Sequence, residues 1–308
     1  MARCVVGTRG SGLALIQTAE VMGRLTAAFE HVDFERVVIR TSGDVRTDLP
    51  IAAVGGEGVF VKELELALER GDIDVAVHSL KDLPTTSPEG LVLAAILPRA
   101  DSREALISAT ARRLADIPDG AVIGTGSLRR RAQLAMINQT WRYAQARGNL
   151  ETRLAKLDEG QFDALILACA GLDRLGHSAR IASRLPYSSL LPAPGQAAIA
   201  VQVRADDAPT RAMASVLDDT ATRAAVTAER ALLREVEGGC QVPLGALATV
   251  AGDRLTLEAI LASLDGFRHV RKRLEGPIAK PEALGITLGL ELLAEGGRNI
   301  LAEVRAAR

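Results

Sequence analysis

Short apolar runs alternate with segments of helical periodicity through the first hundred residues, and this alternation leaves few folds open to the chain. Residues from Ser11 onward and residues 59–71 have apolar side chains at helical spacing, and Gly71 is a typical helix end. Between these helices, strands are predicted at the apolar runs 3–8, 36–41, 72–79 and 91–97. Strands that alternate with helices predict an α/β domain around a largely parallel sheet.

The same pattern begins again near residue 121. Strands are predicted at 121–125, 141–147 and 163–171, and helices at 127–138 and 150–160. The segment "VVGTRGSGLALIQ" (5–17) and the segment "VIGTGSLRRRAQL" (122–134) each read as a strand, then Gly-Thr, then a Ser that opens a helix. This similarity is too weak for a sequence repeat, but it predicts two α/β halves that are built alike.

The last third of the chain has a different character. A Pro- and Ser-rich linker at 186–196 precedes a strand at 197–205 that could return to the first sheet. A long helix after residue 220, two antiparallel strands at 254–263 and 267–276, and a closing helix predict a small α+β domain. The fold class is therefore two periplasmic-binding-protein-like, doubly wound α/β domains plus a small C-terminal α+β domain. The predicted domains are 1–98 with 197–217, 103–192, and 220–308.

The bulk composition excludes several classes of protein. The 308 residues have a formal net charge of −1 and only 3% aromatic residues, so no nucleic-acid partner is indicated. No run approaches the roughly 18 apolar residues of a membrane span. The first ten residues lack the apolar centre of a signal peptide, so we expect a cytoplasmic protein. Three cysteines and four scattered histidines indicate neither a disulfide framework nor a metal site.

One cysteine has unusual neighbours. Cys240 lies in "VEGGCQVPLG" (236–245), with two glycines before it and Pro243 after it. A lone cysteine is usually a small buried hydrophobe. Here the glycines leave the backbone uncovered and the proline ends regular pairing, so we expect a loop with a reachable thiol. A reachable thiolate is a strong nucleophile.

Arginines follow several of the predicted strands. In an open α/β sheet, ligands bind at the carboxyl ends of the strands, and the two Ser-capped corners add helix N-termini that favour anions. For a single arginine or serine, the ordinary interpretation is a solvated charge or a plain helix cap. Arginine also grips carboxylates through two hydrogen bonds, so a recurring set predicts a guest with several negative groups. The arginines at or just past predicted strand ends are Arg9, Arg129, Arg130, Arg147 and Arg174.

A second polar group ends the strand at 72–79. In "AVHSLKDLP" (76–84), Ser79, Lys81 and Asp82 gather before Pro84. Asp82 either starts a turn before the proline, or acts as a general acid/base or a stabiliser of positive charge.

Together these segments resemble hydroxymethylbilane synthase, also called porphobilinogen deaminase, over essentially the whole chain. The motif around Cys240 is similar to the cofactor-attachment signature of that family. The segments of the resemblance are "GTRGSGLALIQT" (7–18), "GGEGVFVKELE" (55–65), "DVAVHSLKDLPT" (74–85), "IGTGSLRRRAQL" (123–134), "RGNLETRLAKLD" (147–158), "PAPGQAAIAVQ" (192–202) and "ERALLREVEGGCQVPLG" (229–245).

The resemblance implies a transferase of haem-type tetrapyrrole biosynthesis. Cys240 would hold a dipyrromethane cofactor through a thioether. The enzyme would add four porphobilinogen molecules to this primer, expel ammonia each time, and release the linear tetrapyrrole hydroxymethylbilane by hydrolysis. The family suggests a monomer.

The resemblance also implies a role for each candidate residue. Asp82 would be catalytic and would stabilise the azafulvenium cation left when the aminomethyl nitrogen departs. Substrate would be bound by Arg9, Ser11, Arg147 and Arg174. Besides Cys240, the cofactor would be bound by Ser79, Lys81, Thr125, Ser127, Arg129, Arg130 and Arg153.

Two other classes of protein fit parts of the sequence. Anion-binding receptors share a two-lobed α/β layout, but that class gives Cys240 no task. A cysteine-dependent acyl transferase would need a histidine base oriented by an acid, and no histidine position suggests one.

Overall fold

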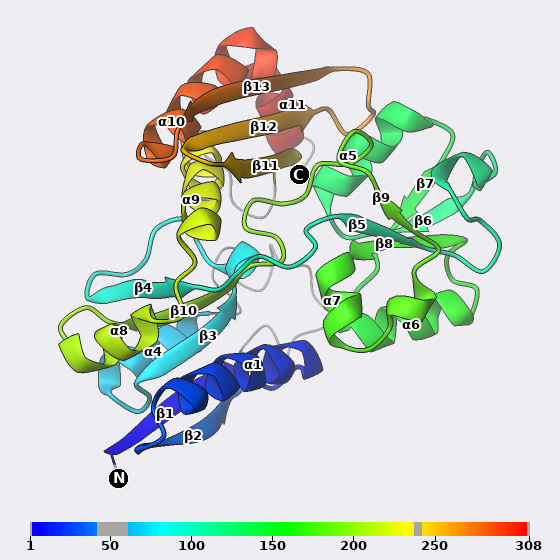
Figure 1. Cartoon of the computed structure of the whole chain (residues 1–308). Helices are drawn as coiled ribbons and strands as arrows, with labels where there is room; N and C mark the ends of the chain where they lie inside the picture. The colour runs from blue at the N-terminus through cyan, green and yellow to red at the C-terminus, as the bar shows by residue number, and fades with distance from the viewer. Residues whose placement is uncertain (1, 42–60, 237–241, 307–308) are drawn as a thin grey trace. The chain divides into compact units, whose positions relative to one another are not determined.

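The computed structural model describes residues 2–41, 61–236 and 242–306 (Figure 1). The chain divides into two compact units, each made of two stretches of sequence. The first unit is Met1–Ala100 with Ala197–Arg223, and the second is Asp101–Gln196 with Ala224–Arg308.

The first unit is built around a five-stranded sheet. Its strands, in spatial order, are β2 (Val32–Ile39), β1 (Ala2–Arg9), β3 (Val75–Ser79), β10 (Ile199–Arg204) and β4 (Leu91–Ile96). β10 is antiparallel to both of its neighbours, and β1 is parallel to β2 and β3. The prediction that the segment after the linker returns to the first sheet is therefore confirmed.

Helices cover both faces of this sheet. Alternate residues of a strand point to opposite faces, and Val6 packs with α1 (Gly12–Ala28) and α8 (Ala208–Ser215). Its neighbour Val5 packs with α4 (Lys62–Arg70) on the other face. Gly71 ends α4 with φ of 75°, a left-handed conformation that favours glycine.

The second unit contains a sheet of the same design. Its order is β7 (Arg142–Ala144), β6 (Val122–Gly124), β8 (Ala164–Ala168), β5 (Glu104–Ile107) and β9 (Ser183–Leu185). β6 is parallel to β7 and β8, and β5 is antiparallel to β8 and β9. α5 (Leu128–Ile137) packs on one face, and α6 (Leu150–Asp158) and α7 (Cys169–Arg174) on the other. The two α/β halves are thus built alike, as the paired corners predict.

The second unit also contains a three-stranded antiparallel sheet of β11 (Leu244–Ala251), β12 (Arg254–Ala262) and β13 (His269–Pro277). Its core is shared with the helices α9 (Thr220–Glu235), α10 (Pro281–Leu292) and α11 (Arg298–Ala306). Gly266, between β12 and β13, has φ of 78°, and a Cβ there would lie 2.3 Å from the Ala135 carbonyl carbon of α5. Only glycine allows this close approach.

The fold class of two α/β domains and a small α+β domain is confirmed, with local corrections. Cys169 was predicted within a strand, but it is the first residue of α7 and is fully buried. β2 begins four residues before the predicted strand. The prediction missed β5, β9, β11, α8, α11 and the short helices η1 (Leu80–Asp82), η2 (Leu114–Asp116) and η3 (Ser178–Arg180), and it treated α10 and η4 (Leu293–Gly297) as one closing helix.

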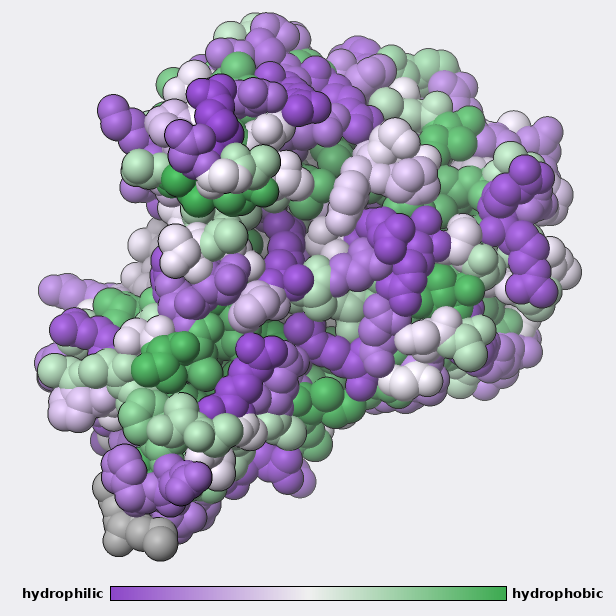
Figure 2. Space-filling model, in the orientation of Figure 1, coloured by the Kyte–Doolittle hydropathy of each residue, from purple (hydrophilic) through white to green (hydrophobic). Residues whose placement is uncertain are grey.

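Among the described residues, the exposed large apolar side chains are Ile16, Val38, Ile137, Val216, Phe267 and Leu290. Figure 2 shows hydrophilic residues over most of the face that it draws, with apolar residues in smaller groups among them. No helix within the described ranges is long and apolar enough to cross a membrane. Nor do the described residues place three His, Cys, Asp or Glu side chains where they could hold a metal ion.

Candidate functional site

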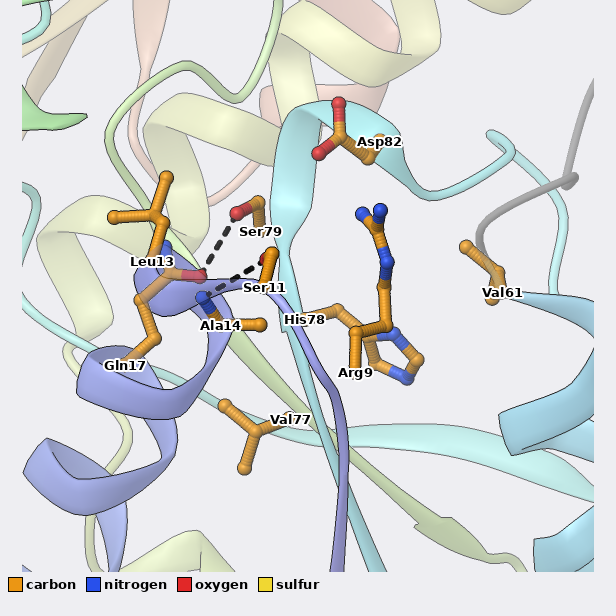
Figure 3. Close-up of a pocket in the computed structure, with 10 residues that line it drawn as sticks. All are labelled: Arg9, Ser11, Leu13, Ala14, Gln17, Val61, Val77, His78, Ser79 and Asp82. Atoms are coloured by element: carbon orange, nitrogen blue, oxygen red, sulfur yellow. Dashed lines mark hydrogen bonds between the residues drawn. The ribbon is translucent and has the colours of Figure 1, made fainter. Parts of the chain in front are cut away.

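A pocket lies at the carboxyl end of the first sheet (Figure 3). Arg9 is the last residue of β1, Ser79 is the last residue of β3, and Asp82 lies on η1 directly after it. Because β1 and β3 are parallel neighbours, their ends bring these side chains to one edge. In Figure 3, the Arg9 guanidinium extends toward Asp82. The pocket therefore combines one fixed cation with one carboxylate.

Two hydroxyl groups of the pocket have defined hydrogen bonds. Ser11 caps α1, because its side chain accepts from the Ala14 backbone N–H at 3.3 Å. The Ser79 hydroxyl donates to Gln17 Oε1 at 2.9 Å, and Gln17 is only 4% exposed. Since a hydroxyl has one proton, this bond leaves the Ser79 oxygen to act as an acceptor toward a ligand. Ser11 therefore both caps α1 and lines the pocket.

His78 lines the same pocket and received no role from the sequence. It is 5% exposed, and its Nε2 lies 3.0 Å from Gln202 Oε1 on β10. Burial lowers the pKa of His78 most; the hydrogen bond to Gln202 opposes this effect and the nearby positive charge of Arg9 adds to it, which together bring the pKa to about 4. The imidazole is therefore neutral at physiological pH.

The buried neutral imidazole makes stability depend on pH. The pKa of His78 is about 4 in the folded protein, against the reference value of 6.5. As the pH falls, His78 is therefore protonated in the unfolded chain before it is protonated in the folded protein. We expect wild type to lose about 2 kcal/mol from this residue between neutrality and about pH 5. His78→Gln should remove that contribution, so its urea midpoint should fall less over the same range. The exposed His269→Gln control should follow wild type, and equal pH dependence in all three proteins would contradict the assignment.

The second unit places other predicted residues at the carboxyl ends of its own strands. Thr125 and Ser127 follow β6, and Arg147 follows β7. Ser127 caps α5 by accepting from the Arg130 backbone N–H at 3.4 Å. Arg153 on α6 donates from Nε to the Gly148 carbonyl at 2.9 Å. Arg174 is the last residue of α7, the helix that follows β8.

Arg129 and Arg130 bind a carboxylate of the protein itself. Glu104 is fully buried, and its Oε1 accepts from Arg129 Nη2 at 2.6 Å while its Oε2 accepts from Arg130 Nη2 at 2.8 Å. Gln196 donates to the same carboxylate at 3.1 Å, and Arg129 also donates to the Leu191 carbonyl at 2.8 Å. Both arginine side chains are less than a tenth exposed. The sequence analysis missed Glu104, which lies in the four-residue strand β5.

Glu104→Gln is expected to destabilise the second unit strongly. The change leaves two buried guanidinium groups without their counter-charge, and breaking a buried ion pair in this way costs about 3–5 kcal/mol. Urea unfolding followed by circular dichroism would measure the loss. Asp158→Asn is the matched control, because it breaks the exposed pair with Arg180 and should change little. Equal, small losses in both variants would show that Glu104 is not the required counter-charge.

Comparison with known families decides between the alternatives. The profile described as "Porphobilinogen deaminase, dipyromethane cofactor binding domain" matches residues 4–212, and that described as "Porphobilinogen deaminase, C-terminal domain" matches residues 223–294. The chain belongs to the porphobilinogen deaminase family. It is therefore a transferase, and the receptor and acyl transferase alternatives are rejected.

Individual relatives agree over nearly the whole chain. The porphobilinogen deaminase of Desulforudis audaxviator (strain MP104C) is 51% identical over 302 residues, which are 98% of each chain. That of Geobacter metallireducens (strain ATCC 53774 / DSM 7210 / GS-15) is 48% identical over 299 residues, 97% of this chain and 94% of the relative. The predictions of the family and of a porphyrin-biosynthesis transferase are confirmed.

Solved structures with a similar arrangement are more distant. A putative methionine-binding lipoprotein from Bacillus subtilis subsp. subtilis str. 168 is 15% identical, with a TM-score of 0.44 over 70% of this chain and 90% of that chain. A nutrient binding protein from Burkholderia cenocepacia bound to methionine is 14% identical, with a TM-score of 0.44 over 68% of this chain and 89% of that chain. The family assignment rests on sequence alone.

The described residues suit the cofactor that the family profile names. Dipyrromethane presents pyrrole N–H donors and several carboxylates. The pocket of the first unit offers a carboxylate and the acceptor oxygen of Ser79 for N–H groups, and Arg9 for a carboxylate. Cys240, the predicted attachment point, lies outside the described residues. The roles of the individual residues remain predictions.

Proposed function

We propose that the chain is a hydroxymethylbilane synthase that polymerises four porphobilinogen molecules on a dipyrromethane held by Cys240, and then releases hydroxymethylbilane by hydrolysis. The observation that supports this most is the meeting of Arg9, Ser11, Ser79 and Asp82 in one pocket at the end of β1 and β3. Arg9 and Ser11 come from one motif of the resemblance (7–18), and Ser79 and Asp82 come from another (74–85).

Asp82 is the catalytic residue of the proposal. The reaction removes the aminomethyl nitrogen of porphobilinogen as ammonia and leaves positive charge on the substrate ring. A carboxylate that is already in place stabilises that charge without reorganisation, which is how preorganised groups lower a barrier. The same carboxylate accepts hydrogen bonds from pyrrole N–H groups and can take up and return a proton.

Arg9 and Ser11 bind the substrate carboxylates in this pocket. Arg9 supplies a charge-assisted hydrogen bond, and Ser11 opens α1, whose N-terminus favours negative charge. Arg147 and Arg174 extend substrate binding in the second unit.

The proposal also assigns the residues that hold the cofactor. When bound, dipyrromethane supplies the pyrrole carbon onto which substrate units are added. Ser79, Lys81, Thr125, Ser127 and Arg153 orient it through hydrogen bonds. Arg129 and Arg130 contribute positive charge near its carboxylates while Glu104 fixes their positions.

Several further features belong to the same proposal. The enzyme works as a cytoplasmic monomer on the small molecule porphobilinogen, without a nucleic-acid or membrane partner. Its three domains are residues 1–98 with 197–217, residues 103–192, and residues 220–308.

An intact-mass measurement on the purified wild-type chain tests the proposed function. We expect an increment equal to two porphobilinogen units that have each lost ammonia. Peptide mapping should place that increment on the peptide that contains Cys240. Incubation with porphobilinogen should then add further increments of one unit. An unmodified chain, or a modification on another peptide, would contradict the proposal.

A further inference from the structure

Three side chains from separate elements form a chain of hydrogen bonds beneath the pocket of the first unit. Glu65 comes from α4, Gln202 from β10 and His78 from β3. Gln202 Nε2 donates to Glu65 Oε1 at 3.0 Å, and Gln202 Oε1 lies 3.0 Å from His78 Nε2. Gln202 is fully buried, so bulk water does not compete for the hydrogen bonds of its amide.

Glu65 sets the direction of both hydrogen bonds in this series. The NH₂ group of Gln202 faces Glu65, because it donates to the Glu65 Oε1 oxygen, which accepts. The Gln202 oxygen then faces His78 and can only accept, which places the imidazole proton on Nε2. In a neutral imidazole with its proton on Nε2, the other ring nitrogen is an acceptor. His78 therefore presents Nδ1 as an acceptor, and Figure 3 shows the ring beside Arg9.

The charged groups around His78 determine which protonation form of its ring suits the pocket. Arg9 on β1 and Asp82 on η1 line the pocket with it, and Glu65 on α4 lies beyond Gln202, where burial raises the pKa of Glu65 and the charge of the exposed Glu69 adds to this effect. A ring that carried a second proton would add a cation beside Arg9, where the reaction itself develops positive charge. A ring with its proton on Nδ1 would present a donor to that same region. Only the neutral Nε2–H form adds an acceptor and no charge.

We propose that Gln202, oriented by Glu65, is a positioning residue that holds His78 as the neutral Nε2–H tautomer, so that Nδ1 accepts a hydrogen bond in the porphobilinogen pocket. His78 in turn offers this acceptor to the N–H groups of the substrate. The inference rests on the proposed function for its catalytic meaning, whereas the tautomer is a property of the protein alone.

Nitrogen-15 NMR of the histidine-labelled holoenzyme tests the tautomer directly. The chain has four histidines, so the ring signals can be assigned with single His→Gln variants. We expect His78 to show one neutral species protonated at Nε2 between about pH 6 and pH 8. A doubly protonated ring, or a neutral ring protonated at Nδ1, would overturn the proposal.

Substitutions of Gln202 separate positioning from mere packing. Gln202→Met keeps the shape and removes the acceptor, so we expect a mixture of the two neutral tautomers and a kcat about tenfold lower, the effect of one lost hydrogen bond. Gln202→Glu should restore the Nε2–H tautomer near pH 6, because two adjacent carboxyl groups share one proton and the protonated member can replace the amide. A single Nε2–H tautomer in the Met variant, or a mixture in the Glu variant, would contradict the proposal.

A matched pair on α4 tests the orienting carboxylate. Glu65→Gln removes the group that fixes the amide, whereas Glu69→Gln removes a charge from an exposed position of the same helix. We expect a tautomer mixture only in the first variant, and equal spectra would refute the role of Glu65. If the tautomers behave as expected but the wild-type chain carries no covalent adduct and adds no porphobilinogen units, the proposed function fails while the positioning of His78 stands.

Discussion

Cys240→Ala is expected to yield a folded chain without covalently bound dipyrromethane and without detectable turnover. The two other thiols cannot replace it. Cys4 is 4% exposed and Cys169 is fully buried, and burial raises the pKa of each to about 12. The thiolate is the reactive form of cysteine, so neither residue can form the thioether at physiological pH. Intact-mass measurement and far-UV circular dichroism on the variant check both parts of this expectation.

Alanine substitutions of the other cysteines are the controls. Cys4→Ala removes a small buried side chain between β1 and the helices of the first unit, and Cys169→Ala does the same at the start of α7. Both variants should keep the covalent adduct, with only the modest loss of stability that a small cavity causes. A normal adduct on the Cys240→Ala chain, or its loss from either control, would show that the anchor is assigned to the wrong thiol.

The corners of the fold could be predicted from sequence because their signals are local. Ser11 and Ser127 each stand before a helical pattern, and each caps the helix that follows it. Gly71 ends α4 in the left-handed conformation, which glycine adopts without the strain that a Cβ would cause. Such positions depend on residues three or four apart, so the sequence shows them directly.

Short strands and strand order depend on distant residues. β5 has only four residues, and it is a strand because it pairs with β8 and β9, some sixty to eighty positions later. Four residues, of which three are apolar, give no periodicity that separates strand from helix. Cys169 shows the same limit, because the run that predicts a strand at 163–171 continues into α7, which begins at Cys169.

The same difference between local and long-range signals applies to the candidate site. Arg9, Ser79 and Asp82 were predicted from their places at strand ends, and the structure brings them together in one pocket. The partners that orient charged groups were missed, because Glu104 binds arginines twenty-five residues away and His78 contacts a glutamine 124 residues away. The signal available in the sequence was a glutamate next to an apolar run. If such a run is buried, the charge of the glutamate needs a partner, because an unpaired buried charge is costly in free energy.

Asp82 is expected to be the residue whose charge matters most for turnover. Asp82→Asn keeps the shape, removes the negative charge and turns half of the carboxylate into a donor that faces Arg9 and the substrate. Loss of a preorganised charge at the reacting centre costs about 100-fold to 1000-fold in kcat. Asp82→Glu keeps the charge but displaces it by about one methylene, and a displacement near 1 Å can cost on the order of 100-fold. We therefore expect slow turnover from the Glu variant and almost none from the Asn variant.

The order of the two variants separates catalysis from a structural role. Asp82 ends η1, and Leu83 N–H closes that turn by donating to the Leu80 carbonyl at 3.1 Å without using the Asp82 side chain. A residue that served only the turn before Pro84 would tolerate asparagine better than glutamate, because asparagine is the common substitute in turns. Steady-state rates, intact mass for the cofactor and thermal melts should be measured on both variants. With folding intact in both and the cofactor present in Asp82→Glu, a faster Asn variant would refute the catalytic role, whereas a faster Glu variant is the result that charge stabilisation requires.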